Sequence, residues 1–280
     1  MSSVAPAVPV APPRTRRPLA LWVGIAFAGF VVVVAVFGQF VSPHSPDALL
    51  GTPFQPPSSD FPLGTDRLGR DVLSRLLHGG LVLLLLGGAT TVLAYVAGTA
   101  VGLYAGYRKG VLDTVLMRTM DGVIALPAVL LLLVLAAAMG PGPAMIIFGI
   151  AAVQMPLVAR LIRTATLEIS TRGYVEAAVA RGESTRSVLY REILPGLWRT
   201  IAAAAVPSLT GSILAIAALS FFGIGLQPPS SDWGSMINEN RVGLQLQPWG
   251  TVAPAAMIAL LVLGVNLIAD WRVRGRGRST

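Results

Sequence analysis

The chain has 280 residues, of which 54% are hydrophobic and only 12% charged, and its formal net charge is +8. A soluble domain carries about twice that charged share, and one core of this size could not bury so much apolar surface. The composition therefore excludes a soluble or disordered chain and indicates an all-α polytopic membrane protein.

The chain has no cysteine, so neither a disulfide framework nor a thiolate metal site is possible. Its basic residues lie between apolar blocks, whereas a nucleic-acid-binding protein gathers them on one folded face. The pattern favours the bilayer and its anionic leaflet as a partner, and no nucleic acid.

Five charge-poor windows are long enough to cross a bilayer as helices, and one of them is long enough for two crossings. Residues 1–18, rich in Pro, Ala and Val, precede the first window and predict a disordered tail. The glycines and prolines at 140–143 divide one window that is too long for a single crossing. The expected spans are 19–41, 81–106, 122–139, 144–162, 200–222 and 249–269.

The first window also resembles a signal peptide, because Arg16 and Arg17 precede it. Its apolar stretch is longer than a signal peptide needs, and residues 43–46 offer no cleavage site of small residues. We therefore favour an uncleaved first span.

The basic residues orient these spans. With the N-terminus inside, the inner segments hold 17 arginine and lysine residues and the outer segments hold four. The positive-inside rule then places both termini in the cytoplasm of a multi-pass cytoplasmic-membrane protein. Residues 42–80 become an extracytoplasmic loop, 81–270 a five-helix core with a cytoplasmic loop at 163–199, and 271–280 a basic cytoplasmic tail.

The extracytoplasmic loop carries helix signals over 65–77. Thr65 can cap a helix, and two acidic residues stand four positions before arginines. The spacing predicts an amphipathic helix at the outer interface. Its ion pairs would be Asp66–Arg70 and Asp71–Arg75, and its apolar stripe Leu68, Val72 and Leu76.

The cytoplasmic loop predicts two short helices. Residues 174–181 are mostly good helix formers, and Gly182 is a suitable left-handed stop. Ser184 can cap a second helix, which Pro195 would end. From the residues alone, this loop is either a docking module for another protein or a linker lying on the membrane.

The same loop resembles the EAA motif of ABC-importer permeases. The matching residues are Glu176, Ala177, Ala178, Gly182, Leu194 and Pro195. Residues 62–76 are similar to the GTD-x-x-GRDVLSRL signature of the C-type permease of dipeptide, oligopeptide and nickel importers. Residues 219–236 resemble the outer loop after the fifth span of the same family, with Pro228, Pro229 and Gly234 expected to break the helix and Trp233 to suit an interface. The resemblance covers residues 19–270.

This resemblance implies a type I ABC importer permease fold with cytoplasmic coupling helices. It also implies a second, B-type permease chain, one or two ABC ATPase subunits and an extracytoplasmic substrate-binding protein. ATP and Mg²⁺ would be used by the ATPase subunits, because this chain lacks a GxxxxGK[ST] loop and binds no cofactor itself. Closure of the ATPases would move the 174–195 loop and switch the pathway between inward- and outward-facing states.

Polar residues within the spans are candidates for the pathway wall or for helix-to-helix hydrogen bonds. They are Gln154, Thr210, Ser212 and Asn266. An ion-coupled secondary transporter is the alternative, although it would usually place a charge in mid-membrane, where this chain has none. No catalytic or metal site is expected, since His44 and His78 lie at outer span ends. Dipeptide, oligopeptide, nickel chelate and haem all remain open as substrates.

Overall fold

The computed structural model describes residues 19–226, 230 and 232–276. The tail expected at 1–18 and the pair Pro228–Pro229 lie outside the described residues. Regular structure in the described part is helical throughout, apart from one isolated bridge between Thr65 and Asp71. The expected all-α fold is confirmed.

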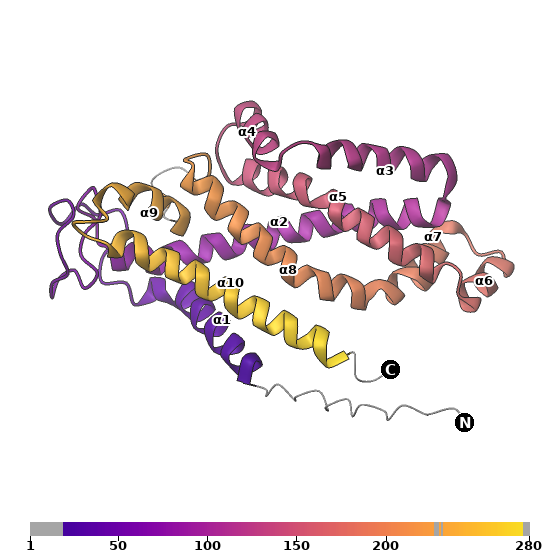
Figure 1. The fold of residues 1–280 in the computed structure, drawn as a ribbon, viewed down its shortest axis with the longest axis horizontal. Coiled ribbons are helices and arrows are strands. Elements are labelled where there is room, and N and C mark those ends of the chain that lie inside the picture. Colours follow the sequence, from indigo (N-terminus) through magenta and orange to yellow (C-terminus); the bar gives the residue numbers. More distant parts are fainter. Residues whose placement is uncertain (1–18, 227–229, 231, 277–280) are drawn as a thin grey trace, which may run out of the picture.

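The molecule is an elongated helical bundle (Figure 1). α6 lies at one end, and α9 lies with residues 42–71 at the other. In chain order the elements are α1 (Leu19–Phe37), η1 (Gly38–Phe40), α2 (Val72–Arg108), α3 (Gly110–Ala125), α4 (Ala128–Met139), α5 (Pro143–Ile169), α6 (Gly173–Ala180), α7 (Thr185–Ser187), η2 (Val188–Ile193), α8 (Leu194–Phe221), α9 (Trp233–Asn240), η3 (Arg241–Gly243) and α10 (Trp249–Arg276).

Five helical stretches of the described chain are long and apolar enough to cross a membrane. They are Leu19–Phe40, Val72–Arg108, Pro143–Ile169, Thr185–Phe221 and Trp249–Trp271. The pair α3 and α4 would make a sixth if it counts as one broken span. Several helices are longer than the apolar windows, because their ends continue past the hydrophobic residues into polar sequence. α10, for example, reaches Arg276 and so includes part of the tail expected at 271–280.

The third expected span, 122–139, is not a single helix. α3 and α4 meet at a break with a bend of 92°. Leu126 is extended there, with φ −81° and ψ 134°, and Pro127 follows it. Proline has no N–H for the helical ladder and disfavours a helical conformation in the residue before it, so the chain turns at this point.

α3 lies beside α5 and is joined to it by two ion pairs. Arg163 donates from Nε and Nη2 to the two carboxylate oxygens of Asp113, each across 2.5 Å. Arg160, about one turn before Arg163 on α5, pairs with Asp121, which lies nearer the break. These contacts fix α3 along α5, while α4 turns away from the line of α3 (Figure 1).

The amphipathic helix expected at 65–77 is not formed as a separate element. α2 begins at Val72, with Asp71 as its N-cap, and continues unbroken to Arg108. The Thr65 hydroxyl does not cap a helix but donates to the carbonyl of Thr52 at 2.6 Å. Leu68 is exposed, whereas Val72 and Leu76 are buried. Tertiary contacts of the loop override the helical spacing of these residues.

A buried ion cluster explains that difference. Asp66 and Arg70 pair as expected, at 2.6 Å, but within a turn rather than a helix. Arg75 does not pair with Asp71; its Nη1 contacts Asp66 at 2.7 Å and Glu239 of α9 at 2.8 Å. We call Asp66, Arg70, Arg75 and Glu239 the outer ion cluster; all but Glu239 are buried. It binds the 42–71 segment, α2 and α9 together.

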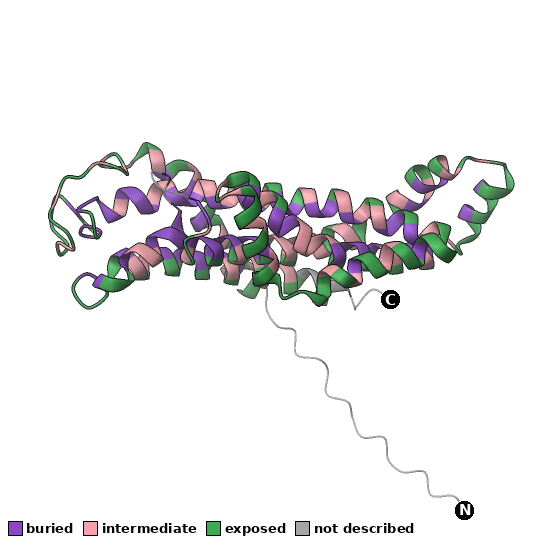
Figure 2. Ribbon diagram, turned by 90° about the horizontal axis from the view of Figure 1, so that it is seen from above, coloured by how far each residue is buried: buried purple, intermediate pink, exposed green. Residues whose placement is uncertain are grey.

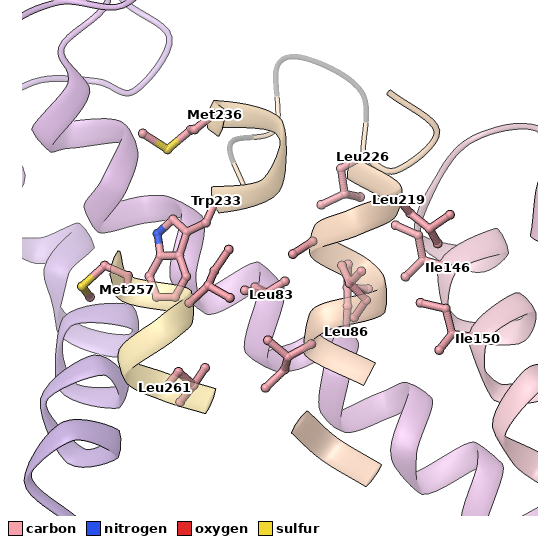
Figure 3. Packing of buried hydrophobic residues seen from close by; sticks show 14 of the residues in the cluster. Leu83, Leu86, Ile146, Ile150, Leu219, Leu226, Trp233, Met236, Met257 and Leu261 are labelled. Carbon is pink, nitrogen blue, oxygen red and sulfur yellow. The ribbon is translucent and has the colours of Figure 1, made fainter. Parts of the chain in front are cut away.

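The outer half of the core gathers around Trp233 (Figure 3). Trp233 is fully buried, and its Nε1 donates to the carbonyl of Leu76 at 2.9 Å, so it does not lie at an interface as expected. Gly234 lies inside α9 and does not end a helix. Asp232 caps α9 by accepting from the backbone N–H groups of Gly234 and Ser235, which fixes Trp233 over α2.

α2 and α5 form the most extensive contact between two helices of the described chain. Gly98, Gly102 and Gly106 of α2 lie against α5, where side chains would collide with the neighbouring backbone. A Cβ at Gly102 would stand 2.6 Å from the carbonyl oxygen of Ala159. Glycine at helical spacing lets the two backbones approach, as small residues do between membrane helices.

Candidate functional site

The segment of residues 173–195, which we call the inner segment, forms two helices that meet at a glycine. α6 ends at Ala180, and Gly182 has φ +80°, so the left-handed stop predicted there is confirmed. Ser184 accepts from the backbone N–H of Ser187 at 3.3 Å and caps the next helix, also as predicted. The chain therefore turns sharply between α6 and α7.

Glu183 stabilises this corner. Its carboxylate accepts from Arg181 Nη2 at 2.6 Å and from the Ser187 hydroxyl at 2.9 Å. These hydrogen bonds, first from Arg181 and then from Ser187, hold the pKa of Glu183 below its usual range. Glu183 is therefore ionised near neutral pH and links both sides of the turn.

The second helix does not end at Pro195. α7 runs directly into the π-helical turn η2 and then into α8, giving one helical stretch from Thr185 to Phe221. Leu194 N–H bonds to the carbonyl of Leu189, five residues back. Pro195, which cannot donate, follows the π turn directly as the second residue of α8. The π turn thus absorbs the proline that was expected to stop the helix.

α6 has a buried face and an exposed face (Figure 2). Val175 and Ala178 are buried in a cluster that includes Val188, Leu189 and Ile193 of η2. Glu176 and Ala177 lie on the exposed face. The inner segment is thus packed against its own helices on one side and open on the other.

The six residues of the motif at 176–195 therefore differ in surroundings. Glu176, Ala177, Gly182 and Pro195 are exposed, Leu194 is partly buried, and Ala178 is buried. Ala178 is not available to a partner, because it is buried in the cluster that includes Val188, Leu189 and Ile193. Its small size instead lets α6 pack closely on η2.

The structure joins two of the four polar span residues. Gln154 of α5 donates from Nε2 to the hydroxyl of Ser212 on α8 at 2.8 Å. The Thr91 hydroxyl of α2 lies 2.9 Å from the same oxygen. Gln154 and Ser212 thus make a helix-to-helix contact among three helices.

Thr210 and Asn266 do not join this group. The Thr210 hydroxyl donates to the Val206 carbonyl of its own helix at 3.3 Å. Asn266 is exposed on α10. Sequence reasoning missed Tyr95 and Ser208, whose hydroxyl oxygens lie 3.1 Å apart between α2 and α8. Their signal was present, because both are polar residues within apolar windows.

A cavity of about 430 Å³, which we call the α4–α8 cavity, lies among α2, α4, α5 and α8. Its lining is mainly apolar and includes Leu132 of α4 and Ile150 of α5. Tyr95, Gln154 and Ser208 are its polar lining residues. The cavity therefore combines an apolar wall with a few hydrogen-bonding groups, as small-molecule sites do.

The two histidines make local contacts at the outer end of α2. His44 Nδ1 lies 3.3 Å from Asp71 Oδ2, and His78 Nδ1 lies 2.8 Å from the Ser74 carbonyl. Over the described residues, no group of three His, Asp or Glu side chains could hold a metal ion.

A family model described as "Binding-protein-dependent transport system inner membrane component" matches residues 98–276. Among curated proteins, the chain is 36% identical over 254 residues to the di/tripeptide transport system permease protein DppC of Pseudomonas aeruginosa, covering 88% of this chain and 84% of that one. It is 35% identical over 260 residues to the glutathione transport system permease protein GsiD of Pectobacterium atrosepticum, covering 91% and 86%.

Two solved structures of inward-facing conformations of the MetNI methionine ABC transporter share the fold. One aligns with a TM-score of 0.57 at 18% identity, covering 72% of this chain and 95% of that chain. The other aligns with a TM-score of 0.54 at 20% identity, covering 71% and 95%. The fold is that of a type I importer permease.

Proposed function

This chain belongs to the family of binding-protein-dependent transport system inner membrane components, and from that premise we propose that it passes di- or oligopeptides across the cytoplasmic membrane. It is a transmembrane permease subunit of the ABC importer class. The observation that carries the peptide assignment is the likeness to di/tripeptide and glutathione permeases over about nine tenths of the chain.

The energy source in this proposal is ATP hydrolysed by partner subunits. The chain has no GxxxxGK[ST] sequence, and its one lysine, Lys109, follows no glycine-rich turn. ATP and Mg²⁺ are therefore assigned to one or two ABC ATPase subunits. The full importer also contains a B-type permease and an extracytoplasmic substrate-binding protein, and this chain itself binds no cofactor.

Reconstitution tests this function directly. Vesicles holding the complete importer are loaded with ATP and Mg²⁺, and uptake of radiolabelled leucyl-leucine is followed with and without the substrate-binding protein. We expect uptake that requires both ATP and that protein and survives a protonophore. Uptake without ATP that a protonophore abolishes would instead establish an ion-coupled secondary transporter.

Within this importer, the exposed face of the inner segment is the docking surface for an ATPase. Glu176 and Ala177 point away from the core, and Gly182 sets the angle at which α6 stands. Ala178 packs α6 onto η2, while Leu194 and Pro195 lead directly into α8. Force applied to α6 is thereby transmitted into a membrane-spanning helix through packed side chains.

The absence of native cysteine makes this docking surface easy to probe. Ala177→Cys should react with a maleimide in the isolated permease and become protected when the ATPase is bound. Val242→Cys, 76% exposed at the other end of the molecule, is the control and should react equally in both states. Equal labelling of Ala177→Cys in both states would exclude ATPase docking on this face.

We place both termini in the cytoplasm. The start of α1, the end of α10 and the inner segment all point toward one end of the bundle (Figure 1), and the basic residues are concentrated in those segments. A reporter active only in the cytoplasm, fused after Thr280, should be active; activity of an export-dependent reporter at that point would reverse the orientation.

Thr210 and Asn266 remain predictions for the pathway. Thr210 bonds within α8, and Asn266 is exposed on α10.

A further inference from the structure

The α4–α8 cavity has the size of a small-molecule site. Its volume of about 430 Å³ falls within the range of roughly 300–1,000 Å³ that ligand pockets occupy. Its wall takes side chains from four helices, and none of the described lining residues is charged. An ionised substrate group would lose its hydration there without a counter-charge, so the lining suits neutral, apolar groups.

The polar groups of the wall form a connected network on one side of the cavity. The Ser212 hydroxyl donates its proton to the Ser208 carbonyl at 3.1 Å, so its oxygen accepts from Gln154 Nε2. The hydroxyls of Tyr95 and Ser208 pair with each other, which leaves one of their two protons available. This network engages Gln154 through its Nε2 atom only.

With Nε2 engaged in this way, the carboxamide oxygen of Gln154 is left without a hydrogen-bond donor in the described part of the chain. Gln154 Oε1 is buried and has no hydrogen-bond partner among the described residues. An unpaired buried carbonyl is costly, and a donor that reached it would recover that cost. The terminal torsion of glutamine is broad, so the carboxamide can turn its oxygen toward a donor within the cavity.

We propose that the α4–α8 cavity is a transit site for the substrate peptide, in which Gln154 Oε1 accepts a hydrogen bond from a backbone amide N–H. The apolar wall receives an uncharged side chain, the charged ends of the peptide stay outside the cavity, and the free hydroxyl proton of the Tyr95–Ser208 pair faces the peptide carbonyl. The site favours peptides with apolar side chains. This inference rests on the proposed function of peptide import and assigns Gln154 as a specificity-determining residue.

A cycle that combines two peptides with two permease variants tests the hydrogen bond. Uptake of leucyl-leucine and of its N-methylated-amide analogue is measured in vesicles with the wild-type importer and with Gln154→Leu. Discrimination by the substrate-binding protein is common to both permeases and cancels in the cycle. We expect Gln154→Leu to lower uptake of leucyl-leucine about tenfold and to leave uptake of the N-methylated peptide nearly unchanged.

Gln245→Leu is the control for this substitution, because Gln245 is exposed outside the cavity. It should transport both peptides as the wild type does. Co-purification of the ATPase subunits with the permease should be equal for all three proteins and shows that each complex is assembled.

A second pair of variants tests the cavity without disturbing its hydrogen bonds. Gly211 lines the cavity, and a Cβ added there would meet no heavy atom within 4 Å. Gly211→Leu should therefore fold and fill part of the space, lowering uptake of leucyl-leucine several-fold but not that of glycyl-glycine. Gly88 also has open space around an added Cβ and does not line the cavity, so Gly88→Leu should transport both peptides normally.

The outcomes separate this inference from the function on which it rests. If wild-type vesicles show no ATP-dependent peptide uptake, peptide import itself fails. If wild-type uptake is normal, then equal losses of both peptides in Gln154→Leu, or normal leucyl-leucine uptake by Gly211→Leu, would overturn the transit site alone.

Discussion

Arg75, at the outer end of α2, donates to the Glu239 carboxylate of α9 across 2.8 Å, although 164 positions separate them in the chain. Both also belong to the outer ion cluster with Asp66 and Arg70. The cluster fastens the segment of residues 42–71 to the helical bundle. Three of its four charged residues are buried and the fourth, Glu239, is partly buried, so their mutual compensation matters for stability.

Removing one carboxylate from this cluster should destabilise the protein strongly. Asp66→Asn removes the carboxylate that pairs with the guanidinium groups of both Arg70 and Arg75. Breaking a buried ion pair in this way costs about 3–5 kcal/mol. We expect a markedly lower thermal midpoint of the purified complex. Asp60→Asn, at an exposed position of the same segment, is the control and should change the midpoint little; equal midpoints for the two variants would contradict a structural role of the cluster.

Gly182 should be required for its backbone conformation alone. In Gly182→Ala the new methyl group meets nothing within 4 Å, so the only penalty is the left-handed φ of +80°, about 1–2 kcal/mol. We expect amide hydrogen exchange in α6 to accelerate and ATPase stimulation to fall. Gly173→Ala also adds a methyl group in open space, at a position without positive φ, and should leave both properties unchanged. Unaltered amide hydrogen exchange in Gly182→Ala would show that alanine causes no strain at this corner.

Gly102 should be required for close packing. In Gly102→Ala the added Cβ would stand 2.6 Å from the Ala159 carbonyl oxygen, so α2 and α5 must separate. Overpacking of this kind costs about 1–3 kcal/mol. The thermal midpoint should fall for Gly102→Ala and not for Gly29→Ala, whose added methyl group meets nothing within 4 Å on α1. Identical midpoints would show that the seam has room to adjust.

Asp232 should make the outer end sensitive to pH. Burial raises the pKa of this carboxyl above its usual value, against the lowering effect of the hydrogen bonds from Ser235. The folded protein therefore holds the proton more tightly than the unfolded chain, and stability is lost as pH rises through the raised pKa. Asp232→Asn keeps the acceptor for the backbone N–H groups of Gly234 and Ser235 but cannot ionise.

The thermal midpoints of the wild type and Asp232→Asn, measured from pH 4 to pH 8, check this expectation. They should be close at the acid end, and the variant should become the more stable of the two as pH rises. A constant difference across the range would show that Asp232 does not titrate differently in the folded and unfolded states.

The sequence predicted features that depend on local chemistry. Gly182 as a left-handed stop and Ser184 as a cap follow from backbone preferences that act over a few residues, and both are confirmed. The Asp66–Arg70 pair was also predicted, but for a helix that does not form. Spacing of four residues suits a helix and this tight turn equally well, so spacing alone could not distinguish them.

Features that depend on distant partners were not predictable. Nothing near Arg75 in the sequence identifies Glu239 as its partner, and Trp233 appeared suited to an interface until Leu76 supplied a buried acceptor. Pro127, within an apolar window, is a local signal for the break between α3 and α4, which the expected single span 122–139 did not take into account. For the α4–α8 cavity, Gln154 was identified as a polar span residue, but its neighbours Tyr95 and Ser208 required the structure.

The π turn η2 also fixes the rotational phase between the inner segment and the rest of α8. A π turn holds one residue more than the α-helical turn it replaces, and one residue corresponds to a rotation of about 100°. Loss of a single residue between Val188 and Ile193 could leave the helix continuous, yet every side chain beyond it would face a new direction. Ser212 would then no longer meet Gln154. The face of the helix on which α6 packs would also be turned relative to the rest of α8.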